Sequence, residues 1–194
     1  MSELDALLTR IRACRLCEAH LPLGPNPVLR AQASARLLIV GQAPGIKVHE
    51  SGVPWNDASG IRLRHWLGLD REQFYDGRRI AIVPMGFCYP GKGTAGDLPP
   101  RPECAPTWHP QLLPLLPSIR LTLLIGHYAQ AGFLGAARGR TLTDTVREHA
   151  RHQPRYFPLP HPSPRNQLWV ASNPWFDAEV VPALRRAVAE ALAD

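Results

Sequence analysis

The stretch ARLLIVGQAPG, residues 35–45, decides the fold. It opens with a short run of apolar residues, which is typical of a buried strand. It closes in a tight turn in which two glycines flank a proline, so that backbone amides could face a ligand closely. The turn holds Gln42, Ala43 and Gly45. Its glycine spacing matches neither the G-x-G-x-x-G dinucleotide fingerprint nor a Walker loop, and an ordinary strand-to-helix turn remains an alternative.

Further apolar runs predict three more strands along the chain, and amphipathic or capped segments predict helices between them. Strands that alternate with helices favour a mostly parallel sheet covered by helices on both faces. We therefore expect one three-layer α/β/α domain over residues 1–194, with a central four-stranded sheet. In the helix at 59–69, Ile61, Trp66 and Leu67 are expected to face inward. The expected strands are 35–41, 78–86, 119–126 and the start of 155–161, and the expected helices are 3–13, 59–69, 107–117, 127–135 and 173–192, the last with an asparagine cap.

Three polar loops follow the predicted strands: GQAPG at 41–45, MGFCYPG at 85–91 and PHPSPRN at 160–166. In an open α/β sheet the ligand crevice lies beyond the carboxyl ends of the strands. Because all three loops follow strands, we expect them to converge on one crevice although they are far apart in the sequence.

The composition is that of a globular protein, with 45% hydrophobic and 20% charged residues. No apolar run reaches membrane-spanning length, and the charged N-terminal helix does not resemble a signal peptide, so a cytoplasmic protein without a membrane partner is expected.

The net charge of +6 suits a polyanion such as nucleic acid. Nearly all the cations are arginines, which bind phosphate well but are also what a GC-rich genome favours.

Two residues of WNDASG, 55–60, have both a structural and a functional interpretation. Asp57 precedes a predicted helix, where an aspartate is a favoured N-cap. A carboxylate in the crevice could also orient water or stabilise a developing sugar cation. Trp55 could belong to the core or provide a stacking surface for a flat ring.

The loop PHPSPRN places several polar side chains on a backbone that cannot flex easily. The prolines at 160, 162 and 164 fix φ and reduce the entropy lost when neighbouring groups are held in place. A proline-rich surface corner is the alternative interpretation. The side chains so presented are His161, Ser163, Arg165 and Asn166.

The four cysteines need an explanation other than disulfides in a reducing compartment. They form one C-x-x-C pair and two later thiols in proline-rich surroundings: Cys14, Cys17, Cys88 and Cys104. Their number satisfies a structural zinc site or a [4Fe–4S] cluster, and spacing does not decide between the two. Buried free thiols are the alternative.

With these residues in view, the chain resembles the uracil-DNA glycosylase superfamily over nearly its whole length. GQAPG is similar to the first motif of that superfamily and HPSPRN to the second. The HPSPRN loop is most similar to the single-strand-selective monofunctional branch. The cysteine pattern and GVPWNDASG, 52–60, resemble instead the iron–sulfur branches, families 4 and 5. The resemblance implies that the four cysteines bind a [4Fe–4S] cluster.

The chain also departs from the motifs of that superfamily at three places. Ala43 stands where the best-known branch has the aspartate that activates water, and family 5 uses an aspartate at the position matched by Asp57. Gly45 replaces a tyrosine that blocks the methyl group of thymine. Pro84 or Met85 falls where an asparagine often reads the edge of uracil.

The resemblance implies a monofunctional DNA repair N-glycosylase that acts on uracil or another deaminated base flipped out of DNA. In that scheme Asp57 and His161 are catalytic, and Ser163 and Arg165 contact DNA, with Arg165 entering the gap left in the duplex. Base-binding residues are Gln42, Ala43, Gly45, Trp55 and Asn166. We expect a monomer. The alternatives are a non-catalytic nucleic-acid-binding member of the same fold and an unrelated zinc-stabilised nucleotide-processing enzyme.

Overall fold

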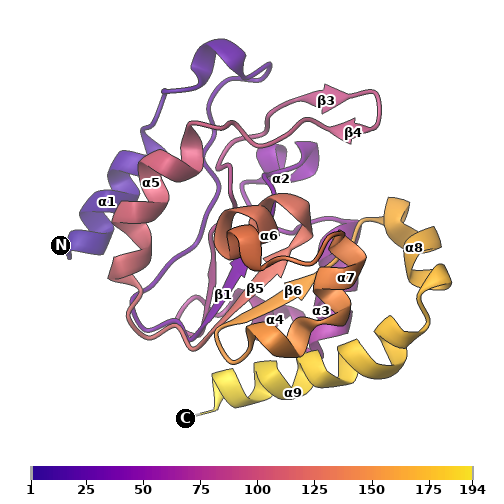
Figure 1. Cartoon of the computed structure of the whole chain (residues 1–194). Coiled ribbons are helices and arrows are strands. Elements are labelled where there is room, and N and C mark those ends of the chain that lie inside the picture. The colour runs from indigo at the N-terminus through magenta and orange to yellow at the C-terminus, as the bar shows by residue number, and fades with distance from the viewer. Residues whose placement is uncertain (1, 194) are drawn as a thin grey trace.

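The computed structural model describes residues 2–193 and consists of a central sheet, a separate small hairpin and surrounding helices (Figure 1). The strands are β1 (Leu37–Val40), β2 (Ile80–Ile82), β3 (Lys92–Gly93), β4 (Gly96–Asp97), β5 (Leu121–Ile125) and β6 (Tyr156–Leu159). The helices are α1 (Glu3–Arg12), α2 (Ile46–Ser51), α3 (Ala58–Leu67), α4 (Arg71–Tyr75), α5 (Cys104–Leu112), α6 (Gly126–Leu134), α7 (Leu142–Arg147), α8 (Gln167–Ser172) and α9 (Val181–Leu192).

The central sheet has four strands in the order β2-β1-β5-β6, and every pairing is parallel. Leu37 at the start of β1 lies opposite Ile80 of β2 on one side and Leu121 of β5 on the other. From β1 the chain moves outward to β2 and then returns to the opposite side of β1. The strand order therefore reverses beside β1, which is where open α/β sheets form their ligand crevice.

Helices cover both faces of the sheet and bury two separate apolar clusters. On one face Ile39 and Leu123 pack with Leu63 of α3 and Leu184 of α9. On the other face Leu38 and Val40 pack with residues of α1, α5 and α6. Because β1 and β5 alternate their side chains between the two clusters, both strands are fully buried. The predicted three-layer α/β/α architecture is confirmed.

Two local expectations fail, and one element was not foreseen. Ile61 is 65% exposed, because it lies on the outer side of α3, whereas Trp66 and Leu67 are buried as expected. Asn173 ends α8 instead of capping the last helix, and its side-chain amide donates to the carbonyl of Trp169. The β3–β4 hairpin was not expected from the sequence at all.

Two further features bear on what the chain can do. Within residues 2–193, no helix combines the length and the apolar character that crossing a membrane would require. The hairpin formed by β3 and β4 projects beyond the sheet, away from α9 (Figure 1). This position brings it over the loops that follow the parallel strands.

Candidate active site

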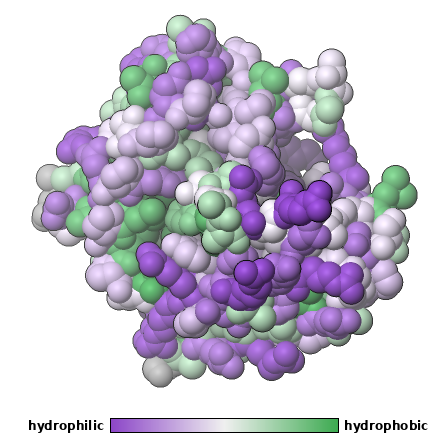
Figure 2. Space-filling model, viewed as in Figure 1, coloured by the Kyte–Doolittle hydropathy of each residue, from purple (hydrophilic) through white to green (hydrophobic). Residues whose placement is uncertain are grey.

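A cavity of about 450 Å³ lies where segments far apart in the sequence meet. Its walls come from the turn at 41–45 after β1, the segment 54–59 before and within α3, the hairpin residues 95–97 and the loop 161–166 after β6. Figure 2 shows a hollow between the hairpin and α8, with strongly hydrophilic residues gathered beside it. Of the three loops expected to converge, GQAPG and PHPSPRN line the cavity. No residue of MGFCYPG lines it, although Pro84, just before that loop, does.

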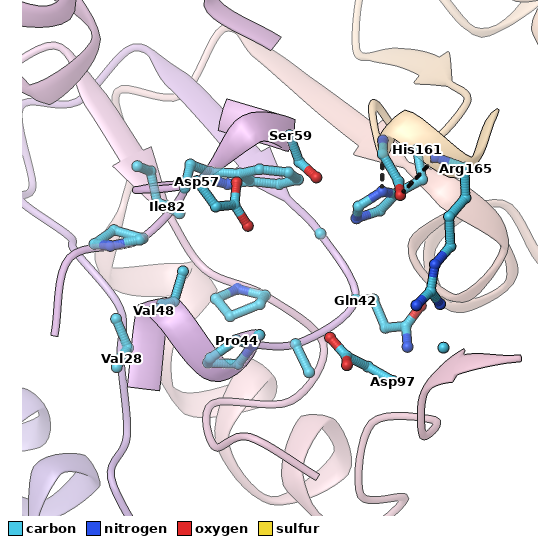
Figure 3. A pocket seen from close by; sticks show the side chains of 18 of the residues that line it. Val28, Gln42, Pro44, Val48, Asp57, Ser59, Ile82, Asp97, His161 and Arg165 are labelled. Atoms are coloured by element: carbon cyan, nitrogen blue, oxygen red, sulfur yellow. Dashed lines mark hydrogen bonds between the residues drawn. The ribbon is translucent and has the colours of Figure 1, made fainter. Parts of the chain in front are cut away.

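Asp57 caps a helix and also lines the cavity. It is the N-cap of α3, and its Oδ1 accepts a hydrogen bond of 2.8 Å from the backbone N–H of Gly60. The same carboxylate faces the cavity (Figure 3). The cap fixes the position of the carboxylate group, so that its second oxygen is presented to the cavity at a defined place.

Trp55 is held against His161 by an unusual backbone. Its φ of 57° makes it the one non-glycine residue within residues 2–193 with a positive φ. A bulky side chain pays a conformational cost there, which the surrounding structure must offset. The indole and imidazole ring centroids are 5.6 Å apart with planes inclined by 33°. One wall of the cavity is therefore aromatic, as a site for a flat ring requires.

Two glycines make room for Trp55. A Cβ at Gly41 would lie 2.8 Å from the indole ring, and one at Gly60 would lie 1.7 Å from the Trp55 carbonyl oxygen. Neither glycine has a positive φ. Both positions are therefore restricted by close approach and not by backbone conformation.

We expect Gly60→Ala to lower the free energy of unfolding by about 2–3 kcal/mol, because the new methyl group would overlap a backbone oxygen that cannot rotate away. Denaturant unfolding followed by circular dichroism measures the change. Ile61→Ala, on the exposed side of the same helix, is the matched control and should stay within about 0.5 kcal/mol of the native protein. Equal stability of the two variants would contradict this account of Trp55.

His161 is positioned by its own loop. The backbone N–H of Ser163 donates to its Nδ1 at 3.2 Å, and the side-chain amide of Asn166 donates to its carbonyl oxygen at 2.8 Å. Burial lowers the pKa of His161, while the charge of Asp57 acts in the opposite direction. A neutral ring whose Nδ1 accepts a hydrogen bond carries its proton on Nε2. His161 is thus prepared to donate a hydrogen bond from Nε2.

The other predicted residues of the site also line the cavity, but several have side chains already engaged with the backbone. Gln42 donates from Nε2 to the carbonyl of Leu98 at 3.0 Å. Arg165, expected in the gap of a duplex, donates to the carbonyl of Ala95 at 3.0 Å. The Ser163 hydroxyl caps the turn at 164–166 by accepting from the Arg165 N–H. Ala43 and Gly45 line the cavity with no polar side chain.

Sequence reasoning missed Asp97, whose carboxylate also faces the cavity (Figure 3). It lies on β4, in the glycine-rich stretch GKGTAGD at 91–97. The glycines of that stretch are the signal that could have indicated a tight hairpin. Nothing in the sequence indicated that the hairpin would fold back over the cavity.

The geometry agrees with a comparison against models of protein families. Residues 30–185 match the model of the uracil DNA glycosylase superfamily, which is most of the chain. The chain belongs to this superfamily. Membership of the uracil DNA glycosylase superfamily supports a DNA glycosylase-type function with DNA as the substrate. In this uracil DNA glycosylase fold, the matched segment includes every residue that lines the cavity except Val28.

The cysteines lie outside the cavity, and Cys14 and Cys17 precede the part matched to the uracil DNA glycosylase superfamily. All four line a second, small and mostly apolar pocket together with Phe87 and Trp108. The backbone N–H of Phe87 donates to the sulfur of Cys104 at 3.4 Å. Burial raises the pKa of Cys88 to about 11 and that of Cys104 to about 12. Within residues 2–193 no three His, Cys, Asp or Glu side chains are close enough together to hold a metal ion.

Proposed function

We propose that the protein is a DNA repair N-glycosylase that hydrolyses the N-glycosidic bond of uracil, or of another deaminated base, flipped out of DNA. The observation that carries the proposal is one cavity that is lined by Asp57 and by the paired rings of Trp55 and His161. A base inside a duplex is stacked, so its glycosidic bond can be reached only after the nucleotide leaves the stack. A cavity with an aromatic wall and two opposed catalytic groups is suited to such a base.

The reaction breaks the bond between C1′ of the sugar and the ring nitrogen of the base, and both electrons leave with the base. Negative charge then develops on the base and positive charge on the sugar. His161 would donate a hydrogen bond from Nε2 to the base carbonyl oxygen that gains charge. Asp57 would stabilise the sugar cation and direct a water oxygen to C1′. One proton of that water is lost to solvent, and the departing base anion takes up a proton.

The absence of an acidic side chain at Ala43 is compatible with this scheme. The turn after β1 lines the cavity, and the carboxylate comes from Asp57 in the next loop. Of the two lysines in the sequence, Lys47 and Lys92, neither lines the cavity. With no lysine amine to form a Schiff base with the sugar, a monofunctional hydrolase is the consistent proposal.

DNA would approach over the hydrophilic face around the hollow (Figure 2). We propose that Ser163 and Arg165 contact phosphates beside the extruded nucleotide. Arg62 donates to the carbonyl of Ser163 at 3.2 Å and brings a further positive charge to the same edge. For Arg165 to enter the gap in the duplex, it would have to leave its hydrogen bond to Ala95. Since one chain supplies all the lining residues, a monomer is sufficient for this activity.

We also propose that Cys14, Cys17, Cys88 and Cys104 hold a [4Fe–4S] cluster. Within residues 2–193 no three of these thiols converge as ligands of a metal ion, so cluster binding would have to draw them together. The fit rests on four thiols that surround one apolar pocket and on an N–H group directed at the Cys104 sulfur, as in the outer shell of iron–sulfur sites. The cluster would supply a cross-link between the segment after α1, the loop after β2 and the start of α5. It has no part in the bond cleavage.

Anaerobically purified protein is expected to be brown, with absorbance near 400 nm and about four irons per chain. Cys88→Ala should remove the colour and lower the thermal midpoint, because the cross-link is lost. Metal analysis and absorbance spectra measure both effects. A colourless protein that contains one zinc ion per chain would contradict the cluster and show that the cysteines form the alternative zinc site.

The proposed function is tested with oligonucleotides that contain a single uracil, hypoxanthine or xanthine, in single-stranded and duplex form. Chromatography of the free base measures release directly. We expect release of uracil from at least one form and no strand cleavage without later alkaline treatment. Binding without release of any of the three bases would instead favour a non-catalytic member of the superfamily.

A further inference from the structure

The cavity needs a polar group for the hydrogen-bonding edge of the base. In each of the two amides first expected to provide it, the NH2 group is already bonded to a backbone carbonyl, which leaves only the neutral amide oxygen as an acceptor. The Gln42 amide N–H donates to Leu98, and that of Asn166 donates to His161. Pro84, at the end of β2, offers no polar side chain. Under the proposed function, Asp57 faces the sugar and His161 donates to the base carbonyl, so neither is available to the hydrogen-bonding edge of the base.

Asp97 is the remaining acidic side chain on the cavity wall. Figure 3 shows the carboxylates of Asp97 and Asp57 directed into the same space from different sides, with the ring of His161 on a third side. Within residues 2–193 no side chain or backbone N–H donates a hydrogen bond to the Asp97 carboxylate. A Cβ at Gly45 would lie 3.3 Å from its Oδ2, so a larger residue in the turn would crowd this oxygen.

The charges around Asp97 come from three elements. Burial raises its pKa, Arg165 and Lys92 lower it, and the like charge of Asp57 raises it. Arg165 belongs to the loop after β6, Lys92 lies opposite Asp97 in the hairpin, and Asp57 begins α3. The carboxylate belongs to an exposed residue, lines the cavity and lies within the electrostatic influence of two cations.

Two predicted site residues hold the hairpin that carries Asp97. Gln42 binds the carbonyl of Leu98 and Arg165 binds that of Ala95, so both chain neighbours of the Gly96–Asp97 strand are fixed. Gly96 has a φ of 136°, which favours glycine, and a Cβ there would displace the guanidinium of Arg165. Gln42 is therefore a positioning residue for Asp97, and Arg165 acts in the same way as long as it keeps its bond to Ala95.

Building on the proposed function, we propose that Asp97 determines specificity by accepting a hydrogen bond from a ring N–H on the edge of the flipped base. In uracil the donor is N3–H, and in hypoxanthine it is N1–H. Deamination of cytosine or adenine creates this ring N–H, because the parent base has a lone pair at the same nitrogen. The hydrogen bond therefore distinguishes uracil from cytosine and hypoxanthine from adenine. Thymine and guanine carry the same ring N–H, so their exclusion depends on other contacts.

The test measures binding of two oligonucleotides that differ by one methyl group. Both contain 2′-fluoro-2′-deoxyuridine, which resists cleavage because fluorine disfavours the sugar cation, and one also carries a methyl group on N3. We expect the methyl group to weaken binding to the native protein by about 10- to 100-fold, the range for a lost hydrogen bond to a charged group. In Asp97→Ala and Asp97→Leu the difference between the two oligonucleotides should fall below about threefold.

Two control variants test whether the methyl discrimination depends on an acceptor at position 97. Asp97→Asn retains a carbonyl acceptor and should keep most of the methyl discrimination, and Thr94→Ala, at the exposed turn of the same hairpin, should keep all of it. Equal discrimination in the native protein and Asp97→Ala, or none in the native protein, would overturn the proposal. Because binding is measured without catalysis, a failure of uracil release would overturn the proposed function while leaving this test decisive.

Discussion

Asp57→Asn is expected to slow uracil release by at least tenfold, and by about 10² to 10³ if the carboxylate supplies as much as other fixed electrostatic groups in active sites. The substitution removes the negative charge that would stabilise the sugar cation. It preserves the helix cap, because asparagine is as good an N-cap as aspartate and can still accept from the N–H of Gly60. The loss should therefore appear in the chemical step and not in folding.

Single-turnover release with enzyme in excess measures the chemical step of Asp57→Asn, and thermal unfolding measures its stability. Asp70→Asn is the matched control, since Asp70 caps α4 in the same way and does not line the cavity. The two variants should have similar thermal midpoints and very different rates. Full activity in Asp57→Asn would leave Asp57 with its capping role alone.

His161→Ala is expected to slow release by about 10² to 10³, the effect of removing one hydrogen-bond donor from a developing anion. The imidazole is held by Ser163 at Nδ1, so Nε2 is available to the base oxygen. His127→Ala is the control, because His127 is an exposed histidine outside the cavity. A rate within threefold of the native value would exclude His161 from the chemistry.

The protonation state of His161 is expected to determine how uracil release depends on pH. Burial places the pKa of His161 below its usual 6.5, so the neutral ring predominates at and above that pH. Protonation of Nδ1 at lower pH removes the acceptor for the Ser163 N–H and disturbs the loop. The rate should stay level from about pH 8 to 6.5 and fall only on the acid side. In His161→Gln this acid limb should disappear; an unchanged limb would assign it to another group.

Much of the architecture could be predicted from the sequence because its cause is local. Uninterrupted apolar runs such as Leu37–Val40 predict buried strands, and their alternation with helices limits the sheet to parallel pairings. Parallel pairing in turn brings the loops after β1 and β6 to one edge. The positions of Asp57 and His161 on a shared cavity follow from that topology.

The finer arrangement could not be predicted because it depends on contacts between distant backbone groups. Strands β3 and β4 have two residues each, too few to show a hydrophobic period. Gln42 and Asn166 were expected to bind the base, and nothing in the sequence shows which carbonyl groups will lie beside their amides. The exposure of Ile61 depends on how α3 is rotated against the sheet.

We propose that an extruded base occupies the cavity lined by Asp57, Trp55 and His161. The most direct measurement is a crystal structure of the slow Asp57→Asn variant bound to an oligonucleotide that contains one uracil. We expect uracil to lie out of the stack, with its face against Trp55 and a carbonyl oxygen within hydrogen-bonding distance of His161 Nε2. A uracil that remains stacked, or that binds at another face while the cavity holds only water, would contradict it.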